Sequence, residues 1–101
     1  MSDDLEEALA AYEQAITLDP HNAIAYLHKG NALKGLGRYE EALAAYERAV
    51  SQDPHNAMAY LHKGDALKSL GRYEEALAAY ERAIRLDPDS VLSYLNKGYA
   101  P

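Results

Sequence analysis

A 34-residue repeat limits this chain to a small set of folds. Residues 23–56 and 57–90 carry the same amino acid at 26 of their 34 positions. Residues 1–22 match the second half of this unit, and residues 91–101 match its start. One unit of this length cannot bury its hydrophobic surface alone, so consecutive units must stack on one another. We therefore expect a single domain over residues 1–101, built as an array of stacked units.

Each unit predicts two helices. In the first half, Tyr26, Gly30 and Leu33 fall on one face of a helix with 3.6 residues per turn. Gly37 favours an end to this helix, and Asp53-Pro54 ends the next one, since proline cannot continue a helix. Residues expected to cap the following helices are Asn22, Asn56 and Ser90. The expected helices span about 3–18, 23–35, 39–52, 57–69, 73–86 and 91–99.

The unit also carries a recognisable motif. It reads Tyr26-x2-Lys29-Gly30-x2-Leu33, then Ala42-x3-Tyr46, Ala49 and Pro54, and it recurs from Tyr60 to Pro88. Over essentially its whole length the chain resembles the tetratricopeptide repeat family, with Tyr where the family has Trp or Phe. Lysine stands where the family favours leucine, and we expect the stems of Lys29, Lys63 and Lys97 to be partly buried with their ammonium groups directed outward. The resemblance implies an all-α fold, a right-handed superhelical α-solenoid of antiparallel helix pairs.

The first helix of each unit has a second stripe, offset from its packing stripe. Ile24, Leu27, His28 and Asn31 form it in the first complete unit. The resemblance implies that this stripe lines a concave groove that binds a peptide, as in an adaptor or scaffold. The expected groove residues are Ile24, Leu27, His28, Asn31, Lys34, Met58, Leu61, His62, Asp65, Lys68, Leu95, Asn96 and Tyr99.

The leucines of this stripe have two readings. Leu27, Leu61 and Leu95 form the groove floor, or they pack neighbouring first helices together. Some members of the family hold a C-terminal carboxylate with Lys, Asn and Arg on the groove floor, and these leucines stand in the corresponding slots. We therefore expect a protein or peptide partner with apolar anchors and a few polar contacts.

Composition excludes several other functions. The net charge is −6 without a basic stripe, which argues against nucleic acid and anionic membranes as partners. Cysteine is absent, the N-terminus is acidic rather than signal-like, and no apolar run spans a membrane, so we expect a cytoplasmic protein. Metal-dependent chemistry at His28 and His62, which should face one groove, is a third and weaker hypothesis, since copying of the unit explains why both histidines recur. The adjacent Glu40 and Glu41 point in different directions, so they form no catalytic pair. We expect no enzyme activity, cofactor or metal.

The two ends suggest an alternative function. The chain begins with a second helix and stops within a first helix, so each end lacks the partner that the other supplies. A self-assembling structural unit, joined head-to-tail or by domain swap, is therefore a second hypothesis. It competes with the adaptor hypothesis, in which the groove binds a partner of unknown identity.

Overall fold

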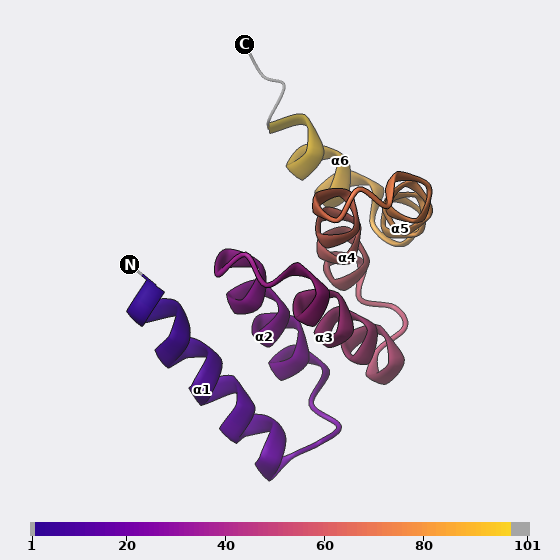
Figure 1. The fold of residues 1–101 in the computed structure, drawn as a ribbon. Coiled ribbons are helices and arrows are strands. Elements are labelled where there is room, and N and C mark those ends of the chain that lie inside the picture. The colour runs from indigo at the N-terminus through magenta and orange to yellow at the C-terminus, as the bar shows by residue number, and fades with distance from the viewer. Residues whose placement is uncertain (1, 98–101) are drawn as a thin grey trace.

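The computed structural model describes residues 2–97, which form six α-helices and no strand. The helices are α1 (Ser2–Leu18), α2 (Ala23–Gly35), α3 (Tyr39–Gln52), α4 (Ala57–Ser69), α5 (Tyr73–Leu86) and α6 (Pro88–Lys97). Each helix packs against the next in the chain, and α4 also contacts both α2 and α6. Figure 1 shows the resulting zigzag, in which α2, α4 and α6 form one layer and α1, α3 and α5 form the other. We call these the inner and the outer layer.

The ends of the helices follow the expected signals in the two complete repeats. Gly37 and Gly71 both adopt a φ of 77°, the left-handed region that glycine enters without steric cost. The side chain of Asn22 accepts the Ala25 N–H, and that of Asn56 accepts the Ala59 N–H. The predicted boundaries of α2 to α5 are therefore confirmed.

The start of α6 was predicted wrongly. The helix begins at Pro88 rather than at residue 91, and Asp87 takes the capping role expected of Ser90. Asp87 Oδ1 lies 3.4 Å from the Ser90 N–H donor, while its backbone carbonyl accepts the Val91 N–H at 3.1 Å. Proline suits the first position of a helix because its missing N–H would have no partner there. Residue 90 is serine rather than the asparagine that caps α2 and α4, and α6 starts at Pro88 instead.

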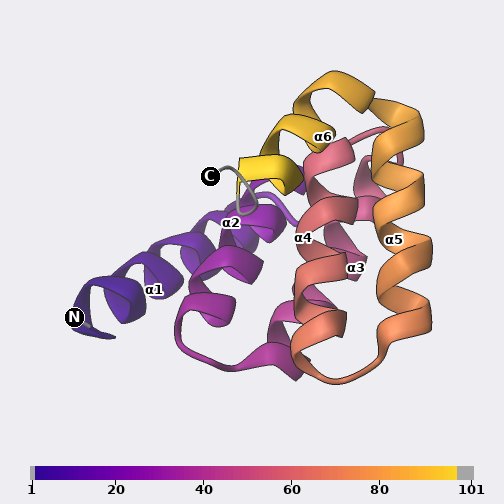
Figure 2. The same cartoon turned by 90° about the horizontal axis from the view of Figure 1, so that it is seen from above.

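Small residues allow the two helices of a repeat to pack closely. Tyr46 on α3 is fully buried, and its ring lies directly against Gly30 on α2. A Cβ added at Gly30 would lie 2.5 Å from a Tyr46 ring carbon, and Gly64 meets Tyr80 in the same way at 2.7 Å. The glycine–tyrosine contact therefore fixes the spacing of the helices within each pair, and Figure 2 shows these pairs from above.

Two hydrophobic clusters hold the layers together. The larger one extends from Leu9 on α1 to Ala79 on α5, and the smaller one joins α4, α5 and α6 through Leu61, Ala83 and Val91. Each repeat thus contributes to the core of the next, as the stacked-repeat expectation requires. Within residues 2–97, no helix is both long and apolar enough to cross a membrane.

Candidate functional site

A polar cluster on the inner layer joins four helices around Asp65 of α4. Tyr80 of α5 donates its hydroxyl to Asp65 Oδ1 at 2.5 Å, and Tyr94 of α6 donates to Oδ2 at 3.4 Å. Lys34 of α2 forms an ion pair with Oδ2 at 3.4 Å and also lies 3.0 Å from His62 Nδ1. The cluster therefore links the two complete repeats and α6 through one carboxylate.

The Asp65 carboxylate stays ionised in this setting. Burial raises its pKa, but hydrogen bonds with His62 and Tyr80 and the charge of Lys34 outweigh burial and lower the pKa to about 2. The pKa of Tyr46 is raised by burial and by the nearby Asp65 charge, and the same two causes raise the pKa of Tyr94. At neutral pH Asp65 therefore carries its charge while the Tyr46 and Tyr94 hydroxyls keep their protons.

Stacked aromatic pairs recur between the outer and the inner layer. The ring of His28 stacks on Tyr12 at 5.3 Å between centroids, and His62 stacks on Tyr46 at 6.0 Å. Tyr46 also donates its hydroxyl to Asn31 Oδ1 at 2.6 Å. His28 remains exposed while His62 is half-buried. The tyrosine that fills the core of one repeat therefore orients polar side chains of the first helices.

The structure divides the expected groove residues into three groups. Leu27 and Leu61 are 8% and 0% exposed, so they pack helices together and offer no surface. Met58 and Leu95 are half-buried against the cluster that contains Leu61. Asn31, Lys34, His62 and Asp65 are half-buried, and Ile24, His28 and Lys68 are exposed. The side chain of Asn96 and the whole of Tyr99 lie outside the described residues.

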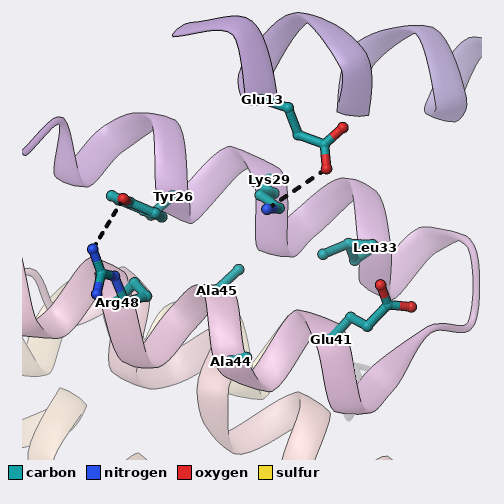
Figure 3. Close-up of a pocket in the computed structure, with 8 residues that line it drawn as sticks. All are labelled: Glu13, Tyr26, Lys29, Leu33, Glu41, Ala44, Ala45 and Arg48. Carbon is teal, nitrogen blue, oxygen red and sulfur yellow. Dashed lines mark hydrogen bonds and ion pairs between the residues drawn. The ribbon is translucent and has the colours of Figure 1, made fainter. Parts of the chain in front are cut away.

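The outer layer carries two equivalent furrows that the sequence reading missed. Figure 3 shows the first, which lies between α1 and α3 over α2 and has a volume of about 260 Å³. The second has a volume of about 310 Å³. The residues lining the first are Glu13, Tyr26, Lys29, Leu33, Glu41, Ala44, Ala45 and Arg48, and each has a counterpart 34 residues later in the second.

Charged side chains are held in place along each furrow. Lys29 Nζ lies 3.6 Å from Glu13 Oε2 with 28% of its side chain exposed, and the Lys63 side chain is 25% exposed, which confirms the expected partly buried stems. The side chain of Lys97 lies outside the described residues. The Arg48 guanidinium lies 5.2 Å from the Tyr26 ring centroid, and its Nη2 donates to the Tyr26 hydroxyl at 3.2 Å. The recurrence of arginine 22 residues after Tyr26 and Tyr60 was the sequence signal for this arrangement.

Several solved structures share this architecture. The first tetratricopeptide repeat (TPR) domain of Spaghetti (RPAP3), bound to the HSP90 peptide SRMEEVD, is 27% identical to this chain with a TM-score of 0.86. The match covers 94% of this chain and 77% of that one. The Arabidopsis OM64 TPR domain is 31% identical with a TM-score of 0.84, spanning 95% and 84%. The TPR2B domain of yeast Sti1, in a pHsp70 complex, is 30% identical with a TM-score of 0.83, spanning 86% and 70%.

Sequence comparison leads to the same family. A search of curated proteins finds no match. A family model described as tetratricopeptide repeat matches residues 2–57 and 27–91, which together include most of the chain. The chain therefore belongs to the tetratricopeptide repeat family.

Proposed function

We propose that this chain is a protein-interaction module that holds a peptide segment along the inner layer formed by α2, α4 and α6. The observation that carries the proposal is the similarity to a domain bound to an HSP90 peptide and to a domain in a pHsp70 complex. The inner layer also offers suitable chemistry, because it exposes Ile24, His28 and Lys68 in addition to the polar cluster at Asp65. We place the module in the cytoplasm and assign it no enzymatic role.

The partner we propose lacks a C-terminal carboxylate anchor. Leu27 and Leu61 are buried and uncharged, so they supply no cation for such a group. Lys34 is already paired with the ionised Asp65. A partner segment with apolar anchors and hydrogen-bond donors fits this surface better than an acidic terminus. The net charge of −6 also disfavours nucleic acid as the partner.

A random peptide library panned on the purified chain tests this proposal. Binding of a selected peptide is then measured by calorimetry for the wild type, His28→Ala and Lys68→Ala on the inner layer, with Arg85→Ala on the outer helix α5 as the matched control. Loss of one useful contact costs about 1.4 kcal/mol, so we expect about tenfold weaker binding for an inner variant. The proposal is wrong if Arg85→Ala loses affinity while both inner variants bind as the wild type does.

Exposed side chains on α5 favour self-assembly as the second candidate function. Leu77 is 58% exposed, whereas its repeat equivalent Leu43 is 5% exposed and packs in one cluster with residues of α4. Tyr73 is likewise 67% exposed. We propose that a second copy covers this apolar surface, head-to-tail or by domain swap. Light scattering over a dilution series checks this: a constant mass of 11.1 kDa removes the candidate, and a rise that Leu77→Ser abolishes supports it.

A further inference from the structure

Three tyrosines at equivalent repeat positions have two different environments. Tyr26 and Tyr60 lie in the outer furrows, where Arg48 and Arg82 cover their rings at 5.2 and 5.7 Å. Tyr94, the third, instead contacts the inner layer. Its ring meets the His62 ring edge-on, with centroids 5.7 Å apart and an interplanar angle of 84°, and its hydroxyl lies 3.4 Å from Asp65 Oδ2.

The difference follows from what surrounds each tyrosine. Tyr26 is 7% exposed because α3 covers it, and its hydroxyl also donates to the Pro20 carbonyl at 3.0 Å. Within the described residues α6 packs only against α4 and α5, so Tyr94 has no covering arginine and is 40% exposed. The Tyr94 hydrogen bond at 3.4 Å is long, and two fifths of the residue is already in contact with solvent. Tyr94 is therefore free to leave His62 and Asp65.

We propose that His62 and Asp65 form a binding site for an aromatic hydrogen-bond donor, a tyrosine-type side chain of the partner peptide, and that Tyr94 occupies this site in the free chain. This inference rests on the proposed peptide-binding function. Edge-to-face packing suits an aromatic ring against the imidazole, and a carboxylate is a strong acceptor for a phenol hydroxyl. Tyr80 engages Oδ1 and Lys34 shares Oδ2, so the carboxylate is held in a fixed orientation.

The preceding repeat provides an internal contrast. His28 and Asn31 occupy the equivalent positions on α2. The Asn31 amide oxygen accepts the Tyr46 hydroxyl at 2.6 Å, as Asp65 Oδ1 accepts that of Tyr80, but the neutral amide has no second acceptor oxygen to match Asp65 Oδ2. Tyr60, the counterpart of Tyr94, lies in the outer furrow beneath Arg82. The carboxylate of Asp65 therefore distinguishes the second site from the first. The Asp65→Asn substitution therefore replaces the carboxylate of the second site with the neutral amide present in the first.

Two small probes test the site directly. N-acetyl-tyrosinamide and N-acetyl-phenylalaninamide are titrated into the wild type, Tyr94→Ala and the matched control Tyr60→Ala, while the His62 ring signals are followed by NMR. We expect the tyrosine probe to bind Tyr94→Ala at least threefold more tightly than the wild type or Tyr60→Ala. It should also bind Tyr94→Ala at least threefold more tightly than the phenylalanine probe does. Equal His62 responses in the wild type and Tyr94→Ala, or equal affinity for both probes, would overturn the inference.

Further variants separate a local role from misfolding and from the general proposal. Tyr94→Phe keeps the ring and removes the hydroxyl, so it should also bind the tyrosine probe more tightly than the wild type. Adding Asp65→Asn to Tyr94→Ala should abolish the preference for tyrosine over phenylalanine, and a retained preference contradicts the role of the carboxylate. If library peptides bind the inner layer without any preference for tyrosine, the tyrosine site is wrong and the peptide-binding function stands. If the probe binds at His62 but no library peptide binds, the general proposal alone fails.

Discussion

At the scale of single residues, the contact between Gly30 and Tyr46 has the least tolerance for change. A methyl group at Gly30 would lie 2.5 to 2.9 Å from three atoms of the Tyr46 ring, which is fully buried and cannot retreat. Overpacking of this kind costs about 1–3 kcal/mol, partly offset by about 0.5–1 kcal/mol because alanine favours a helix. We expect Gly30→Ala to lower the free energy of unfolding by about 1–2 kcal/mol in urea denaturation.

Gly35 supplies the control for this prediction. An added Cβ there meets only the end of the Leu5 side chain, at 3.0 Å, and Leu5 is half-buried with room to move. Gly35→Ala should stay within about 1 kcal/mol of the wild type. If Gly30→Ala proves as stable as Gly35→Ala, the glycine–tyrosine contact does not set the helix spacing.

The lowered pKa of Asp65 predicts how the free energy of unfolding changes with pH. Its folded pKa of about 2 lies below the value of about 3.9 for an unfolded chain, so its contribution is present above about pH 4 and is lost as the pH falls towards 2. Between pH 5.5 and 2.5, the wild type should lose about 1–2 kcal/mol more unfolding free energy than Asp65→Asn. Urea denaturation at each pH measures the difference. Parallel profiles for the two proteins would mean that the cluster does not stabilise the ionised form.

At the scale of elements, the helix caps give a direct comparison between α4 and α6. Asn56→Ala removes the acceptor for the Ala59 N–H and should cost about 1 kcal/mol of unfolding free energy. Ser90→Ala should cost almost nothing, because Asp87 rather than Ser90 lies at the start of α6. Thermal denaturation of both variants checks this. Equal losses would support the sequence-based start of α6 at residue 91.

The sequence predicts elements better than it predicts which side chains stay exposed. The 34-residue period and the caps at Asn22 and Asn56 determine α2 to α5, because these signals are local and repeated. At α6 the repeat diverges, and proline with Asp87 shifts the start. The sequence pattern also reveals the second stripe of the first helices. It does not reveal that Leu61 is buried, because Leu61 packs against Ala83 of α5 and Val91 of α6. Burial of this kind requires the packing between repeats, which periodicity alone does not give.

At the scale of the whole molecule, stability should vary along the solenoid. Each helix contacts mainly its neighbours in the chain, so the repeats in the middle are supported on both sides. α6 is supported only by α4 and α5 within the described residues and exposes Leu92 and Tyr94. We expect slower amide hydrogen exchange in α3 and α4 than in α6. Exchange from α6 as slow as that from α3 would indicate a single cooperative unit.

The central claim is that the inner layer holds the partner. Its most direct test is an NMR titration of the isotope-labelled chain with a library-selected peptide. The account predicts that the shifted amide signals belong to α2 and α4 and centre on His28, His62 and Asp65, while the furrow residues on α3 and α5, such as Glu41, Arg48 and Arg82, keep their positions. Shifts confined to α3, α5 and the furrows between the outer helices would contradict the account and transfer the binding site to the opposite face.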